Sequence, residues 1–145
     1  MTAEAAAAKE WLERNNDVYA EINGMYMKLE EMREAAARLV SVPQENKVQT
    51  QPDPHSIETR ILSLLEFEKR IDEKYALAVA SDEQTRKAIL KLRSGKERVV
   101  LLYRYYNRLP WKEIAENLRY SVSHCYELHA SGLEHIAPLI DYTIT

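Results

Sequence analysis

The residue types best suited to metal or thiol chemistry in this chain gather near its C-terminal end. Cys125 and His129 are four residues apart, so a helix would place both on one face, and His124 and His135 are close to them in sequence. A zinc site needs three or four such ligands, and Cys125 is the only cysteine in the chain. We therefore predict that Cys125 and His129 are core or cap residues and that the protein binds no metal.

Catalysis requires a nucleophile beside a base, paired carboxylates in a pocket, or a glycine-rich loop that holds phosphate. The three glycines of the chain are scattered, and His55, next to Pro54, has no catalytic partner in the surrounding sequence. We predict that the protein is not an enzyme and has no cofactor. The single cysteine also excludes an internal disulfide and is typical of a reducing compartment.

Residues 111–133 have the pattern of two helices joined by a tight turn. Ile114, Ala115 and Leu118 form an apolar face on a first helix predicted over residues 111–117, and a turn follows at residues 118–121. Ser121 can cap the second helix because its hydroxyl accepts an unpaired backbone N–H group. Such a pair can form a helix-turn-helix, whose second helix enters the major groove of DNA.

In that arrangement the start of the second helix carries the residues that contact base edges. A glutamate at this place can accept a hydrogen bond from the N4 amino group of cytosine, but its charge also repels phosphate. The candidates that we predict to face the bases are Ser121, Val122, Ser123, His124 and Glu127.

Positive charge for the DNA backbone would come from residues that precede this second helix. The chain has a net charge of −3, but no Lys or Arg follows Arg119, and a basic band runs from Arg86 to Arg119. Phosphate contacts supply most of the non-specific affinity for DNA. The alternative is a solvated helix face with ion pairs between residues i and i+4. The residues that we predict to contact phosphate are Arg104, Arg108, Lys112, Arg119 and Tyr120.

The segment from Glu97 to Leu133 resembles region 4 of bacterial sigma-70 factors. The residues that carry this likeness are Leu102, Arg104, Tyr105, Glu113, Ile114, Ala115, Leu118, Ser121 and Leu133. Over roughly residues 45–135 the chain is also similar to the small sigma-70 region 4-like regulators of phages and prophages, the ArpU-type late transcription regulators. This second likeness rests on Asn46–Thr50, Trp111–Glu116 and Tyr126–His129. It implies binding to double-stranded DNA near late genes and activation of their transcription.

The elements that position these residues are predicted to be helices throughout, so the fold class is all-α. Apolar residues alternate at spacings of four and three from Trp11 to Leu39, and the pattern recurs over residues 57–78. The two stretches can form an antiparallel hairpin or pair with another subunit, and the loop 41–56 between them contains Pro43, Pro52 and Pro54. The residues that we predict for oligomerisation are Trp11, Asn15, Val18, Ile22, Met25 and Leu29.

Asn15 is the polar exception on this apolar seam. A buried asparagine can fix register and oligomeric state, whereas a polar residue near a helix end can also mark fraying. The sequence leaves both alternatives open.

A third helix is predicted from about Asp82 to Tyr106, capped by Ser81 or Asp82, with Gly95 bending or dividing it. Leu109 and Pro110 separate this third helix from the helix-turn-helix motif. Trp111 is expected to pack against the third helix. The chain thus divides into a helical hairpin over residues 1–80, which provides oligomerisation, and a helix-turn-helix domain over residues 81–145.

Three functions fit these patterns. The first is a DNA-binding transcriptional regulator that acts as a homo-oligomer on spaced half-sites. The second is an interaction module that contacts RNA polymerase or another regulator through Val122, Tyr126 and Ala130, without binding DNA. The third is an assembly protein that resembles a small terminase subunit. No apolar run in the sequence approaches the roughly 20 residues that span a bilayer, so we expect a cytoplasmic protein that does not enter a membrane.

Overall fold

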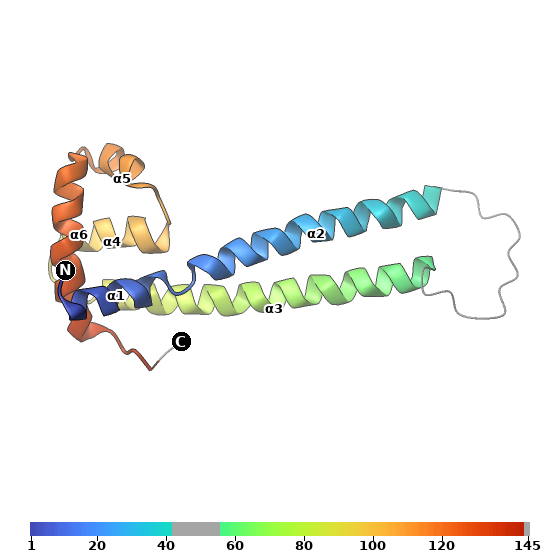
Figure 1. Cartoon of the computed structure of the whole chain (residues 1–145), viewed down its shortest axis with the longest axis horizontal. Helices are drawn as coiled ribbons and strands as arrows, with labels where there is room; N and C mark the ends of the chain where they lie inside the picture. The colour runs from blue at the N-terminus through green and yellow to red at the C-terminus, as the bar shows by residue number, and fades with distance from the viewer. Residues whose placement is uncertain (42–55, 144–145) are drawn as a thin grey trace, which may run out of the picture. The chain divides into compact units, whose positions relative to one another are not determined.

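The computed structural model describes residues 1–41 and 56–143, and the regular elements of this part are all helical (Figure 1). The prediction of an all-α fold is confirmed. The loop predicted over residues 41–56, with its prolines and His55, lies outside the described residues except at its two ends, as does the segment 46–50. The elements are α1 (Ala3–Glu13), α2 (Asn16–Ser41), α3 (Ile57–Ile89), α4 (Gly95–Leu101), the π-helical turn η1 (Leu102–Tyr106), α5 (Trp111–Leu118), α6 (Val122–Ile136) and the 3₁₀ turn η2 (Ala137–Leu139).

The chain folds as two compact units. Unit 1 contains residues 1–16 and 78–145, and unit 2 contains residues 17–77. The boundary predicted at residue 80 therefore differs from the structure, because α1 belongs with the C-terminal helices. Ala5, Ala8 and Leu12 on the buried side of α1 join Leu133 and Ile136 of α6 in one apolar cluster. Sequence spacing alone could not reveal this contact across more than a hundred residues.

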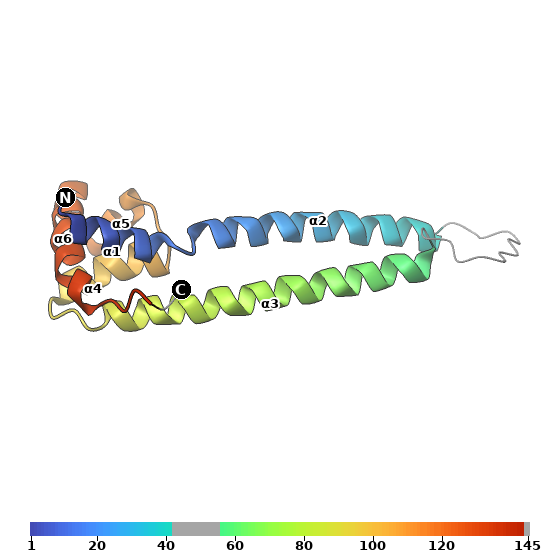
Figure 2. The ribbon, with the colours of Figure 1, turned by 60° about the horizontal axis from the view of Figure 1, so that its bottom comes forward.

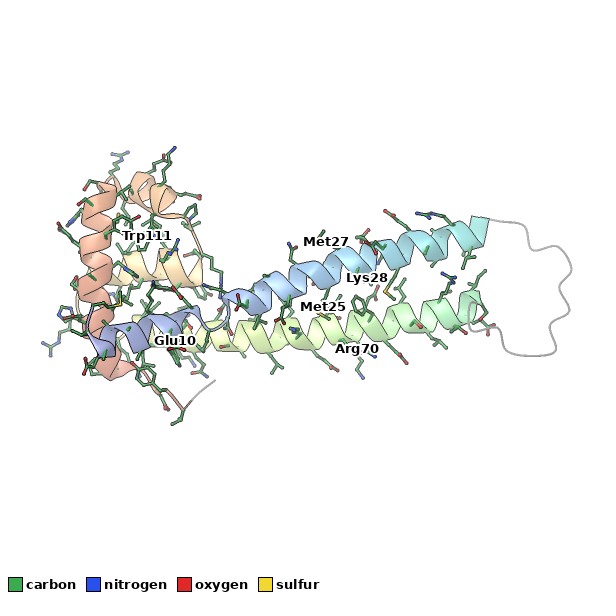
Figure 3. The ribbon with its side chains drawn as sticks, in the orientation of Figure 1. Glu10, Met25, Met27, Lys28, Arg70 and Trp111 are labelled. Carbon is green, nitrogen blue, oxygen red and sulfur yellow. The ribbon has the colours of Figure 1, made fainter. Side chains whose placement is uncertain are left out.

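Unit 2 is an antiparallel hairpin of α2 and the first part of α3 (Figure 2). Ile22 and Leu29 are buried on α2, and Ile71 is buried on α3. Figure 3 shows Met25 on the side of α2 that faces α3 and Met27 on the outer side. From Val18 to Leu29 the predicted seam is thus confirmed as the inner face of a hairpin within one chain.

The helix predicted from Trp11 to Leu39 breaks at Arg14 and Asn15, which is a correction. The Arg14 guanidinium lies 3.7 Å over the Trp11 ring and donates to the carbonyl oxygen of Ser81 at 2.8 Å. The Asn15 amide donates to the Asp82 carboxylate at 3.3 Å. Trp11 and Asn15 are therefore used inside unit 1 and do not continue the seam of the hairpin.

The third helix predicted over residues 82–106 is wrong in its start, but the predicted division at Gly95 is confirmed, because α4 begins at that residue. Ser81 and Asp82 lie inside α3, which continues to Ile89, and the chain turns over residues 90–94. The Arg98 guanidinium stabilises this turn by donating to the Leu92 carbonyl at 2.6 Å, and Ser94 caps α4 by accepting from the Glu97 N–H group at 3.3 Å. The break falls here because these two side chains satisfy the backbone groups at the helix ends.

Glycine at position 132 allows α6 to approach α4 closely. A Cβ atom on Gly132 would lie 3.3 Å from Cδ1 of Leu101 and 3.5 Å from Cβ of Glu97. Leu101 is fully buried, so it has little space to move. Along the described parts of the chain, no helix combines the length and apolar character needed to cross a membrane.

Candidate nucleic-acid interface

Three residues, Arg119, Tyr120 and Ser121, join α5 to α6, so the turn predicted at residues 118–121 is confirmed except that Leu118 still belongs to α5. Arg119 adopts the left-handed conformation with φ 57°, and its N–H group donates to the Glu116 carbonyl at 3.3 Å. The Ser121 hydroxyl accepts from the His124 N–H group at 3.0 Å, which confirms its role as the N-cap of α6. These hydrogen bonds fix the direction in which α6 leaves the turn.

A small apolar cluster holds the two helices of the motif together. Ile114, Ala115 and Cys125 are buried, and the half-buried Leu118 and Trp111 pack against them. The predicted apolar face of α5 is confirmed. Burial raises the pKa of the Cys125 thiol, so this cysteine is a neutral core residue. Among the described residues, no group of three or more His, Cys, Asp or Glu could hold a metal ion.

Beneath the motif lies a buried polar pair that sequence reasoning missed. The Tyr105 hydroxyl and Nε2 of His129 are 2.5 Å apart, and both side chains are buried. Burial, with smaller contributions from the charges of Lys9 and Arg104, lowers the pKa of His129 to about 4. The imidazole is therefore neutral near pH 7. The available signal was that a tyrosine on a buried helix face needs a partner for its hydroxyl.

Trp111 of α5 contacts side chains of both α6 and η1 (Figure 3). Its ring centroid lies 4.9 Å from that of Tyr126 and 4.8 Å from that of His129, both on α6. The Arg104 guanidinium of η1 lies 4.8 Å over the same ring. The expectation that Trp111 packs against the residues of the predicted third helix is confirmed, although these residues now form η1.

The residues predicted to face DNA bases lie together at the exposed start of α6. Ser121, Val122, Ser123 and Glu127 are exposed. His124 is half-buried, with its ring 4.9 Å from that of Tyr120 and its Nδ1 3.6 Å from the Glu127 carboxylate. This surface offers two hydroxyl groups, an imidazole and a carboxylate, which together can donate to and accept from base edges.

The predicted phosphate contacts divide into two groups. Lys112, at the start of α5, and Arg119, in the turn, are exposed. Arg108 instead forms an ion pair with Asp82 at 2.8 Å, and Arg104 donates to the Leu109 carbonyl at 3.1 Å while it covers Trp111. Tyr120 is half-buried against the apolar cluster of the motif. The guanidinium groups of Arg104 and Arg108 are thus used inside unit 1, which leaves Lys112 and Arg119 as the exposed cations of the predicted set.

Two other members of the basic band, Lys91 and Arg93, lie away from the start of α6. Lys91 and Arg93 line a pocket of about 350 Å³ together with His135 and Leu139, which lie at and beyond the C-terminal end of α6. A helix of 15 residues is about 22 Å long, so this pocket is far from Ser121. Beside it, Nδ1 of His135 is 2.9 Å from the buried Glu97 carboxylate. Lys91 and Arg93, which line this distant pocket, therefore cannot flank the start of α6.

Comparisons of the chain with protein families, with curated proteins and with solved structures find no match.

Proposed function

We propose that unit 1 is a DNA-binding helix-turn-helix module of a phage- or prophage-type transcriptional regulator, which acts in the cytoplasm of its bacterial host. The observation that supports this most directly is the exposed first turn of α6. Its direction is fixed by the Ser121 cap and by the cluster around Ile114 and Cys125. A fixed helix start with solvent-accessible polar side chains is what entry into the major groove requires. The proposal includes no catalytic step and no cofactor.

In the proposed complex, the first turn of α6 lies in the major groove. Ser123 and His124 donate to or accept from base edges, and Glu127 accepts from the N4 amino group of cytosine. The N–H groups and positive dipole of the α6 N-terminus favour a nearby phosphate. Lys112 and Arg119 contact the backbone from the start of α5 and from the turn.

The small number of exposed cations among the predicted phosphate contacts sets the expected strength of binding. Two neutralised phosphates per unit give a slope of about −1.8 in log K against log salt, which indicates modest non-specific affinity. Specific binding must then depend strongly on the contacts of α6 with bases. It would also gain from two copies bound to two half-sites.

A selection of duplexes from a random-sequence pool, followed by fluorescence anisotropy at several salt concentrations, tests the proposal. Lys112→Ala and Arg119→Ala should each weaken binding and reduce the salt slope by about 0.9. Lys91→Ala and Arg93→Ala are the matched controls, since each also removes one exposed cation, and they should leave binding unchanged. The absence of any DNA binding at low salt by the folded protein would reject the proposal.

A second candidate function is a protein contact made by α6. Tyr126 is 49% exposed, Val122 is also exposed, and α6 carries no Lys or Arg. A surface of this kind can meet RNA polymerase or another regulator without DNA. Binding to purified RNA polymerase that is lost in Tyr126→Ala, together with no binding to DNA, would favour this candidate.

A further inference from the structure

We infer that the hairpin of unit 2 pairs with a second copy of the chain through an outer stripe of α3. The stripe consists of Glu58, Leu62, Leu65 and Lys69, which follow one another at spacings of four, three and four. Residues at these spacings lie on one side of a helix. All four are exposed in the single chain.

The outer stripe differs from the side of α3 that packs against α2 within the hairpin. Toward α2 the helix presents Ile57, Leu64 and Ile71, seven residues apart, of which Ile71 is fully buried. Seven residues bring a helix almost back to the same angle, so these three lie on one line. Leu65 precedes Ile71 by six residues, and at about 100° per residue this is a rotation of about 600°. That is about 120° short of two full turns, so the Leu65 side chain points away from the line of Ile57, Leu64 and Ile71. Leu62 and Leu65 are 62% and 53% exposed.

The charges of the outer stripe favour a second copy of the chain as the binding partner. When two α3 helices cross antiparallel with Leu62 opposite Leu65, the same register places Glu58 of each copy opposite Lys69 of the other. A twofold interface has this reciprocal pattern, in which residue i meets residue j and j meets i. Neither Glu58 nor Lys69 has an ion pair with any other described residue of its own chain.

The inner core of the hairpin is small for its length, which also favours a partner. Among the described residues of unit 2, the buried apolar side chains are Ile22, Leu29 and Ile71. Isolated helices depend on the packing of an apolar face for their stability. Two hairpins that pair through their outer stripes form a four-helix arrangement and bury the leucines that are now exposed. Unlike the predicted seam, which is used within the chain, the outer stripe is available for association.

Sedimentation of the full chain over a wide range of protein concentrations, without DNA, tests this inference. We expect a reversible equilibrium between monomer and dimer. Leu62→Ala and Leu65→Ala should each weaken dimerisation roughly tenfold or more, because each removes a buried apolar contact twice in a symmetric dimer. Far-UV circular dichroism should show unchanged helicity, since both residues are exposed in the monomer.

Charge reversal makes the test specific to the register. Glu58→Lys and Lys69→Glu should each weaken the dimer, and the double variant should recover it. Leu77→Ala is the matched control, because Leu77 is 73% exposed on α3 but lies outside the stripe, and its dimerisation should match the wild type.

A monomer at all concentrations, a double variant that stays weak, or a ring of many subunits would each overturn the inference. The inference does not depend on DNA binding, so its failure would leave the proposed function of unit 1 in place.

Discussion

At the scale of single residues, the neutral state of His129 links the turn η1 to the helix that is proposed to read DNA. Its Nε2 is 2.5 Å from the Tyr105 hydroxyl, and the ring also packs against Trp111. Protonation in the buried site would place a charge beside Arg104 and Lys9, which already lower the pKa of His129. The imidazole therefore stabilises unit 1 only while it is neutral.

We predict that unit 1 loses stability as the pH falls from about 6.5 toward 4. The unfolded histidine titrates near its ordinary pKa of about 6.5, whereas the folded one titrates at about 4. Between these values the unfolded state binds more protons, so acid favours unfolding, by up to about 3 kcal/mol at the low end. Both tryptophans, Trp11 and Trp111, lie in unit 1, so urea unfolding followed by tryptophan fluorescence measures this effect.

His129→Gln is the matching variant, because it keeps a polar side chain that does not titrate in this range. Its stability should be lower than that of the wild type at pH 7 and should change less between pH 6.5 and 4. An equal loss in both proteins would show that other groups are responsible.

At the scale of elements, one carboxylate connects three segments of unit 1. The Asp82 side chain on α3 accepts from Asn15, between α1 and α2, and from Arg108, before α5. Arg108 has φ 55°, a conformation that is unfavourable for a residue other than glycine. Arg14 lies close enough for Asp82 to raise its pKa, against the larger lowering that burial causes.

We expect Asp82→Asn to destabilise unit 1 by about 2 kcal/mol, because it leaves two arginines without their anion in a partly buried place. Glu83→Gln is the control: it removes the neighbouring carboxylate, whose ion pair with Arg86 is about 40% accessible to solvent, and should have little effect. Urea unfolding followed by tryptophan fluorescence compares the two. Similar stabilities for both variants would contradict the proposed connecting role of Asp82.

Two glycines in helices provide a second prediction at this scale. Gly24 on α2 has open space around the position of a Cβ atom, whereas Gly132 on α6 meets Leu101. Gly24→Ala should stabilise its helix by about 0.5–1 kcal/mol through helix propensity. Gly132→Ala gains the same propensity but crowds a fully buried leucine, at a cost of about 1–3 kcal/mol. Thermal unfolding followed by circular dichroism should therefore give opposite shifts in Tm, and shifts of the same sign would contradict the tight contact of α6 with α4.

At the scale of the whole molecule, buried apolar side chains are distributed unevenly. Unit 1 contains a cluster that runs from Ala5 to Ile140, whereas the described part of unit 2 buries three large apolar side chains. The charge is uneven as well, because residues 1–84 hold 10 basic and 17 acidic side chains, against 10 and 6 in residues 85–145. Because the larger apolar cluster lies in unit 1, we expect the free energy of unfolding to be greater for unit 1 than for unit 2.

We predict that urea removes helicity in two steps. The hairpin should unfold first, seen by circular dichroism but not by tryptophan fluorescence, because unit 2 contains no tryptophan. If the hairpin pairs with a second copy, the first step should move to higher urea as the protein concentration rises. Coincident transitions by both probes at every concentration would show that the two units unfold as one.

The sequence by itself determined the features that depend on neighbouring residues. Periodicity predicted the all-α fold and the inner face of the hairpin, and the apolar face of α5 and the Ser121 cap predicted the motif at the start of α6. These signals are local, because capping and amphipathic spacing act within one or two helical turns.

Only the tertiary structure decided the features that depend on contacts between distant segments. It placed α1 and Trp11 with the C-terminal helices, broke the long N-terminal helix at Asn15, and carried α3 past Asp82. It also placed the half-buried Arg104 and Arg108 in contacts within unit 1, which leaves Lys112 and Arg119 as the exposed cations of the predicted phosphate contacts. The physical reason is that an arginine pattern looks the same whether its partner is a phosphate or a carboxylate 26 residues away.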